Sequence, residues 1–157
     1  MTLFEIFDWL ELSAPGTFIR DSVWLFPVIE AGHLLGLSIL GGAVLLVDLR
    51  LLGFGLTSKS PVYVLNQASP WQLGAIAAMF ATGVPLFLSE AVKCYFSPAF
   101  WWKMGALTLA LCFTFGVRNR IIRSRATLSP WHARGIAGCS IALWLFVASA
   151  GRWIGFS

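Results

Sequence analysis

Glu30 and His33 lie inside the first long apolar run, and their side chains could act together on a bound cofactor. On a helix, residues three apart are separated by about 60° around the axis, so the two side chains share one face. A carboxylate beside an imidazole orients the ring and leaves its second nitrogen free to hold a ligand. The spacing therefore predicts a cofactor-binding pair, with His33 as the ligand of a haem, a metal ion or a quinone.

Other metal chemistry is harder to build from this sequence. A di-iron carboxylate site requires two Glu-x-x-His motifs, and Glu30-x-x-His33 is the only one here. A bis-histidine haem requires two rings on one iron, and the second histidine, His132, is expected near the opposite membrane surface. Single-histidine ligation, a ligand from a second protomer and no haem at all stay open. So does a His33 that only hydrogen-bonds to Glu30 or to a carbonyl group.

Three further ionisable residues, Glu90, Lys103 and Arg152, lie near the expected outer ends of the later spans. Charges inside a membrane are costly, so these residues, with Glu30 and His33, predict a polar cluster in the outer half of the bundle. Arg152 could pair with either glutamate, and Lys103 could extend to the lipid headgroups. An ion-pair cluster that only fixes helix register would explain the same residues without any activity.

A second group of charges is expected at the inner ends of the first and third spans. It consists of Asp48, Arg50, Arg118 and Arg120. Asp48 closes the first span, and we expect it to pair with an arginine that begins the basic loop. The loop's arginines also suit anionic lipid headgroups. These interpretations are structural, and they predict an inner ion pair rather than a substrate site.

The elements that must position these residues follow from a very apolar chain. Of 157 residues, 58% are hydrophobic and 11% are charged, and the mean hydropathy is +0.80. Soluble domains have about 25% charged residues, so the composition excludes a water-soluble globule, a disordered chain and a disulfide scaffold. We expect one membrane domain over residues 1–157, an all-α integral membrane four-helix bundle. Its spans are predicted at about 23–55, 71–92, 98–117 and 135–156.

The N-terminal segment 2–12 alternates an apolar stripe with an acidic one at helical spacing. This pattern predicts a short amphipathic helix on the outer membrane surface. An ordered tail that packs on the bundle is an equally good interpretation.

Orientation is predicted from the distribution of Lys and Arg. One side of the membrane would hold Arg50, Lys59, Arg118, Arg120, Arg123, Arg125 and Arg134, and the other Arg20, Lys93, Lys103 and Arg152. The side with more positive charge is the cytoplasmic one. We therefore expect the arginine-rich loop in the cytoplasm and both termini in the periplasm.

The expected partners are the lipid bilayer and other membrane helices. Pairs of small residues four apart, such as Gly32 with Gly36 and Gly151 with Gly155, let helices approach closely. They serve packing within the chain, self-association or contact with other membrane subunits. The positive charges cluster in one loop, which favours membrane orientation over binding of nucleic acid.

The first span carries the most distinctive pattern, Glu30-Ala31-Gly32-His33 followed by Asp48-Leu49-Arg50-Leu51-Leu52-Gly53. This EAGH…DLRLLG pattern, with Phe100-Trp101-x-Lys103 and Gly151-Arg152 later, resembles an uncharacterised family of bacterial four-helix integral membrane proteins. The resemblance covers nearly the whole chain. It implies the fold, the key positions and the bacterial inner (plasma) membrane, but not an activity.

Three classes of function fit these residues. The first is a cofactor-binding subunit (haem, metal or quinone) or an accessory subunit of a membrane redox complex, with His33 at its centre. The second is a transporter of protons, cations or small solutes through Glu30, His33 and Glu90. The third is a purely structural membrane subunit. The sequence contains no nucleophile–base pair, phosphate loop or closed metal site, which argues against an independent enzyme.

Overall fold

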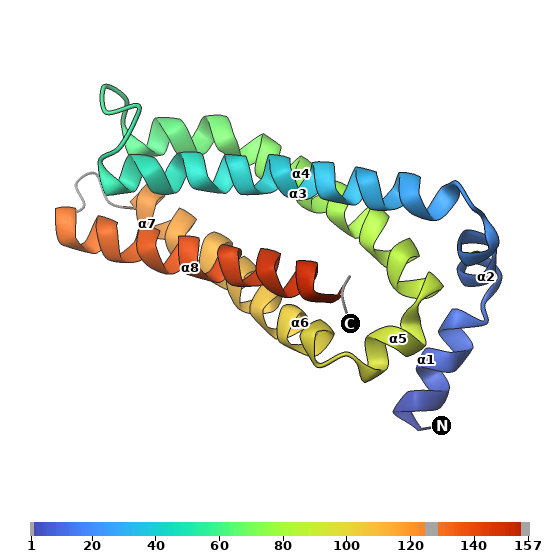
Figure 1. Cartoon of the computed structure of the whole chain (residues 1–157). Coiled ribbons are helices and arrows are strands. Elements are labelled where there is room, and N and C mark those ends of the chain that lie inside the picture. The colour runs from blue at the N-terminus through green and yellow to red at the C-terminus, as the bar shows by residue number, and fades with distance from the viewer. Residues whose placement is uncertain (1, 125–128, 155–157) are drawn as a thin grey trace.

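Four long helices dominate the structure, a computed structural model that describes residues 2–124 and 129–154 (Figure 1). Each is long and apolar enough to cross a membrane. They are α3 (Leu25–Leu52), α4 (Pro61–Ser89), the continuous span Pro98–Ser124 and α8 (Pro130–Ile154). The span Pro98–Ser124 consists of α6 (Pro98–Leu111), the π-helix η1 (Cys112–Arg118) and α7 (Asn119–Ser124). No strand occurs in the described residues, so the predicted all-α membrane fold is confirmed.

Helix α4 begins at Pro61, well before the expected start of the second span at Trp71. The Ser60 hydroxyl accepts a hydrogen bond from the Tyr63 backbone N–H, and proline suits the first helical position because it needs no N–H partner there. The helix also continues through Pro70. Hydropathy marks the part of a helix that suits lipid, whereas the cap marks where the helix itself begins.

The ends of the other long helices also differ from the predicted limits of the spans. The third span continues to Ser124 rather than ending near residue 117, and α8 begins at Pro130 rather than near residue 135. Helix α3 stops at Leu52, because the following Gly53 adopts a left-handed conformation with φ of 89°. Residues 155–156 of the expected fourth span, and Arg125 of the basic loop, lie outside the described residues.

Helices α3 and α8 form the centre of the bundle. Helix α3 packs against α4 on one side and α8 on the other, and α8 packs against α6. We call the end that carries α1, α2 and α5 the N-terminal end, and the opposite end, with the α3–α4 connection and α7, the loop end (Figure 1). Two buried apolar clusters hold these helices together. The first comprises Val47, Leu51, Val64, Leu65, Ala68, Ile122, Ala133 and Ala137, and the second Leu40, Val44, Ala75, Ala106, Ala110, Trp144 and Val147.

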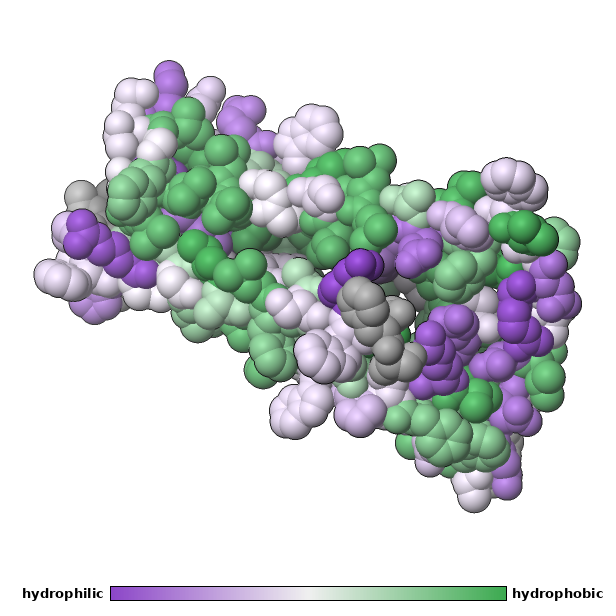
Figure 2. Space-filling view, viewed as in Figure 1, coloured by the Kyte–Doolittle hydropathy of each residue, from purple (hydrophilic) through white to green (hydrophobic). Residues whose placement is uncertain are grey.

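The surface has the polarity expected of a membrane protein. Figure 2 shows hydrophobic residues over much of the middle of the visible face and hydrophilic residues toward both ends. Large apolar side chains such as Leu35 and Leu73 are more than half exposed on α3 and α4. In a bilayer these side chains would contact lipid rather than water.

The predicted N-terminal helix forms as α1 (Leu3–Glu11), and it packs on the bundle. Thr2 and Glu5 build a capping box at its start. Phe7 is buried and packs edge-on against Tyr95 of the short helix α5 (Ala91–Phe96). Of the two interpretations of this segment, the structure therefore supports an ordered helix held against the bundle.

A second short helix, α2 (Ala14–Asp21), follows α1 and was not predicted from the sequence. The Glu11 carboxylate connects these segments, since it accepts hydrogen bonds from Arg20 of α2 at 2.9 Å and from the backbone N–H of Val92 in α5 at 2.6 Å. A carboxylate at the first turn of α5 also suits the positive end of that helix.

Gly16 is the point at which α2 meets α4. A Cβ atom at this position would lie 2.7 Å from the carbonyl oxygens of both Glu11 and Leu88, which are backbone atoms that cannot move aside. We expect Gly16→Ala to lower the free energy of unfolding by about 1–3 kcal/mol, because an overpacked contact must push α2 away from α4. Gly135→Ala is the control, because nothing lies within 4 Å of a Cβ there. Equal thermal stability of the two variants in detergent would contradict the close approach of α2 and α4.

Candidate functional site

His33 is held by the neighbouring helix. Its Nδ1 atom lies 2.8 Å from the hydroxyl oxygen of Thr82 on α4, and both side chains are partly buried. The ring also lies against Gly83, where a Cβ atom would come within 3.1 Å of the ring's Cε1 atom. The absence of a side chain at Gly83 therefore makes room for the imidazole between α3 and α4.

The Thr82 hydroxyl determines which nitrogen of His33 carries the proton. Its oxygen lies 2.7 Å from the carbonyl oxygen of Ala78, one turn earlier on α4. A carbonyl only accepts hydrogen bonds, so the hydroxyl proton points to Ala78. In this arrangement the Thr82 oxygen accepts from an N–H at His33 Nδ1, which is the assignment that satisfies both contacts. In the neutral ring this leaves Nε2 without a proton, as a hydrogen-bond acceptor or ligand atom.

Glu30 does not orient the His33 ring. The carboxylate is exposed on α3, and among the described residues no hydrogen bond or ion pair joins it to His33. The helical spacing of the two residues was read correctly, but the ring turns toward α4 and takes Thr82 as its partner. Of the expected cofactor-binding pair, only His33 is held by a partner of the kind that fixes a ligating imidazole.

Lys103 is the charged residue that interacts electrostatically with His33. It lies on α6, is partly buried, and runs past Gly151 of α8, where a Cβ atom would be 3.5 Å from its Nζ atom. Its positive charge acts on the His33 ring and on the thiol of Cys94 in α5. The small residue on α8 thus lets a lysine from α6 reach between the helices.

The remaining members of the expected outer cluster do not gather around His33. The Glu90 carboxylate oxygen Oε2 lies 3.9 Å from Nζ of Lys93, and both side chains are roughly two-fifths exposed. Arg152 is exposed near the end of α8. Burial and the nearby Glu90 carboxylate raise the pKa of the Cys94 thiol to about 11, so this cysteine stays a neutral thiol at physiological pH. Of the expected cluster, Lys103 is therefore the residue whose charge acts on His33, whereas Glu90 lies beside Lys93 at α5.

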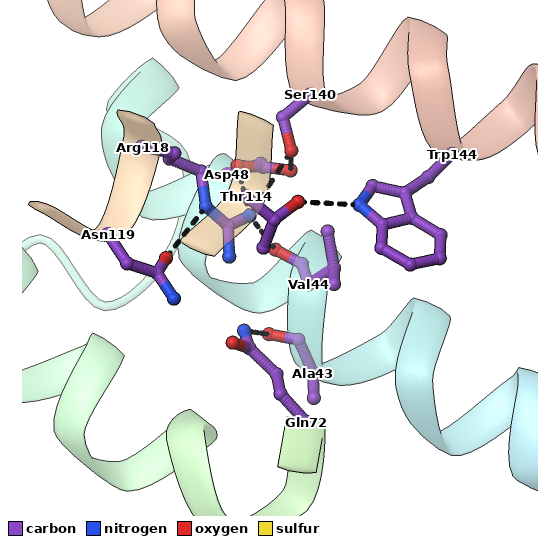
Figure 3. Close-up of polar contacts among 9 residues, drawn as sticks. All are labelled: Ala43, Val44, Asp48, Gln72, Thr114, Arg118, Asn119, Ser140 and Trp144. Carbon is purple, nitrogen blue, oxygen red and sulfur yellow. Dashed lines mark hydrogen bonds and ion pairs between the residues drawn. The ribbon is translucent and has the colours of Figure 1, made fainter. Parts of the chain in front are cut away.

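A second polar centre lies nearer the loop end and is completely buried (Figure 3). Arg118 of η1 donates to the Asp48 carboxylate of α3 at 2.8 Å, and both side chains have no exposed surface. Ser140 of α8 donates to the other Asp48 oxygen at 2.7 Å and also receives a hydrogen bond from Arg118. This centre joins three of the four spans through charged and hydroxyl groups.

Several polar residues that the sequence analysis did not single out surround this ion pair. Asn119 accepts from Arg118 Nε at 3.1 Å, and the Trp144 indole donates to the Thr114 hydroxyl at 3.0 Å. Gln72 of α4 donates to the carbonyl of Ala43 at 3.1 Å. Thr114 and Gln72 are polar residues in apolar stretches of their helices, whereas Asn119 lies between two arginines. A polar residue in an apolar helix needs a hydrogen-bond partner inside the protein, so its presence in such a helix was the sequence signal for a buried polar centre.

The π-helix η1 bears two residues of this centre, Thr114 and Arg118, which are both buried. Such wide turns are rare in proteins and occur most often where a functional site needs them. Here the wide turn presents both side chains to α3 and α8.

The other residues of the expected inner group lie elsewhere. Arg50 donates to the backbone carbonyl of Lys59 at 2.6 Å and so fixes the α3–α4 connection. Arg120 is exposed. Arg118 was expected near the start of a loop, but the third span continues through it and encloses it.

The described residues contain no group of three or more His, Cys, Asp or Glu side chains that could hold a metal ion. His132 is exposed at the start of α8, at the loop end, where its Nδ1 atom lies 2.6 Å from the Ser129 hydroxyl. The two histidines of this chain therefore do not meet.

One comparison with known proteins identifies a family whose function is unknown. A family model described as "Family of unknown function (DUF6644)" matches residues 6–157. No curated protein and no solved structure matches the chain.

Proposed function

The chain belongs to the DUF6644 family of unknown function, and we propose that it is a membrane subunit that binds a quinone at His33 for a larger redox complex. The observation that carries the proposal is the orientation of the His33 ring, whose Nδ1 lies 2.8 Å from the Thr82 hydroxyl oxygen. If Thr82 accepts from Nδ1–H there, Nε2 of the neutral ring is left as an acceptor. A quinol offers an O–H group that can donate to such a nitrogen.

Lys103 favours a quinone over the other two cofactors. A quinol carries two hydroxyl groups, so one of its oxygens can accept a hydrogen bond from an ammonium group while the other O–H donates to an unprotonated imidazole nitrogen. Lys103 supplies such a cation, and its charge acts on the His33 ring. A bare metal ion in a protein usually takes three or four ligand side chains, which His33 does not have around it. A haem iron at this position would have His33 as its only histidine ligand from this chain, because His132 lies at the other end of the bundle.

Direct chemical analysis tests this proposal. The protein is purified in mild detergent, extracted with organic solvent, and the extract is analysed for quinones, while an absorption spectrum is recorded before extraction. We expect quinone in amounts comparable to the protein and no haem bands. A haem spectrum with no quinone in the extract would overturn the proposal. A colourless protein that neither retains nor rebinds quinone would instead leave an accessory, structural role.

Within the same proposal, the protein resides in a bacterial inner (plasma) membrane with its partner subunits. Gly32 and Gly36 are used within the chain, because a Cβ at either position would touch Thr82 or Met79 of α4. Gly42 and Gly74 face open space instead. Helices of partner subunits and lipid chains would meet these open positions.

The orientation gives a separate prediction. The excess of Lys and Arg at the loop end favours a cytoplasmic loop end and periplasmic termini. Alkaline phosphatase fused after Ser157 is therefore expected to be active, whereas green fluorescent protein at the same position stays dark. The reverse pair of results would place the termini in the cytoplasm and contradict the charge argument.

A further inference from the structure

Within the residues that the structure describes, two polar atoms of the buried centre have no hydrogen-bond partner. One is Nη2 of Arg118 and the other is Oε1 of Gln72, and both residues are fully buried. In the view of Figure 3, the unbonded nitrogen of the Arg118 guanidinium points to the side on which the Gln72 amide of α4 lies. Buried polar groups are almost always satisfied by protein or by ordered water, so this pair indicates an occupant.

The two atoms cannot be satisfied by rearranging the groups already present. The Gln72 amide nitrogen is used by the Ala43 carbonyl, so turning the amide over would set two carbonyl oxygens against each other. The other nitrogens of Arg118 are bound to Asp48, Ser140, Asn119 and the Val44 carbonyl. The guanidinium is therefore fixed in place, and its remaining N–H groups point toward α4.

The chemistry of the pair selects the occupant. The guest must accept a hydrogen bond from a cationic N–H and donate one to an amide carbonyl. A small anion meets the Arg118 donor but is repelled by Gln72 Oε1 and by the Asp48 carboxylate beside it. A metal cation is repelled by the guanidinium. A neutral molecule with one O–H and a lone pair fits both atoms, and buried water commonly has two to four such partners.

We propose that an ordered water molecule occupies the space between Arg118 and Gln72 inside the membrane span. It completes a continuous series of hydrogen bonds from Gln72 on α4, through Arg118 and Asp48, to Ser140 on α8. Helix α4 packs on α3 and on the short α7, but not closely on α6 or α8 within the described residues. The water is therefore the connection between α4 and the polar centre of the other spans.

Magnetic resonance of the labelled protein tests the water site. The chain has two glutamines, Gln67 and Gln72, so [¹⁵N]glutamine labelling gives two side-chain amide signals. We expect a cross-peak between the Gln72 amide and a water proton. The nuclear and the rotating-frame Overhauser effects at this cross-peak should have opposite signs, because that difference in sign marks a long-lived water. The exposed Gln67 amide should show only rapidly exchanging water.

Two variants complete the experiment. Gln72→Met keeps the side-chain length but removes the acceptor, so the long-lived water should also disappear from the Arg118 guanidinium signals. Gln67→Met is the matched control and should leave those signals unchanged. A wild-type spectrum without a long-lived water at the Gln72 amide would overturn the proposal, whatever the folding of the variants.

Discussion

Replacing Arg118 by methionine is expected to lower the free energy of unfolding by about 3–5 kcal/mol. The substitution leaves the Asp48 carboxylate fully buried, with only the Ser140 hydroxyl to stabilise its charge. A buried charge without its partner is among the most costly defects in a folded protein. The change is measured by unfolding the purified protein in mixed detergent micelles, with tryptophan fluorescence as the signal.

Two further variants separate this effect from a general loss of arginine. Arg120→Met, two residues further along the same span, removes an exposed side chain and should change stability by less than about 0.5 kcal/mol. Asp48→Leu combined with Arg118→Met removes both charges and should recover most of the loss, because no isolated charge stays buried. An Arg118→Met variant as stable as Arg120→Met would contradict the buried ion pair.

His33→Ala is expected to weaken quinol binding by about 10- to 100-fold, while the protein still folds. The lost hydrogen bond at Nε2 and the unpaired group left behind cost about 1–3 kcal/mol of binding free energy. Each 1.4 kcal/mol corresponds to about a tenfold change in the dissociation constant. Binding is measured by titrating the protein in nanodiscs with a short-chain quinol and following tryptophan fluorescence.

The controls for this prediction use the partners that the structure gives to each group. Thr82→Val removes the acceptor of Nδ1–H and should weaken binding less than His33→Ala, and Thr82→Ser should restore it. Glu30→Gln and His132→Ala should bind like the unaltered protein, because neither residue contacts the His33 ring. If His33→Ala binds quinol as well as His132→Ala does, His33 is not the binding residue.

Much of the fold could be predicted from the sequence, because lipid leaves a chain few options. A backbone in hydrocarbon must satisfy its own hydrogen bonds, so four apolar runs mean four helices. Hydropathy does not report where such a helix begins outside the lipid, which is why α4 starts before Trp71. Helix α2 was missed because Pro15 and Gly16 resemble a turn, whereas here the proline occupies the first turn of the helix and the glycine permits the contact with α4.

For the candidate site, the sequence predicts which residues share a face of one helix but not which residues of another helix they contact. Helical periodicity put Glu30 and His33 on one face, but the rotation of α3 against α4 decides that Thr82 is the partner of His33. The same limit applies to the inner centre. Asp48 was expected to meet an arginine, and the continuation of the third span through η1 decides that this arginine is the enclosed Arg118. Gln72 was marked only as a polar residue in an apolar helix, and its sequence position did not show which group on another helix it would meet.

The central claim is that His33 presents an unprotonated Nε2 to a quinol, and ¹⁵N magnetic resonance of histidine-labelled protein tests it most directly. His132→Ala removes the only other histidine, so the remaining ring signals belong to His33. We expect a protonated Nδ1 and an unprotonated Nε2, with the Nε2 resonance shifting when quinol is added and the Nδ1 resonance staying in place. A proton found on Nε2 instead of Nδ1, or an Nε2 resonance that quinol does not move, would contradict it.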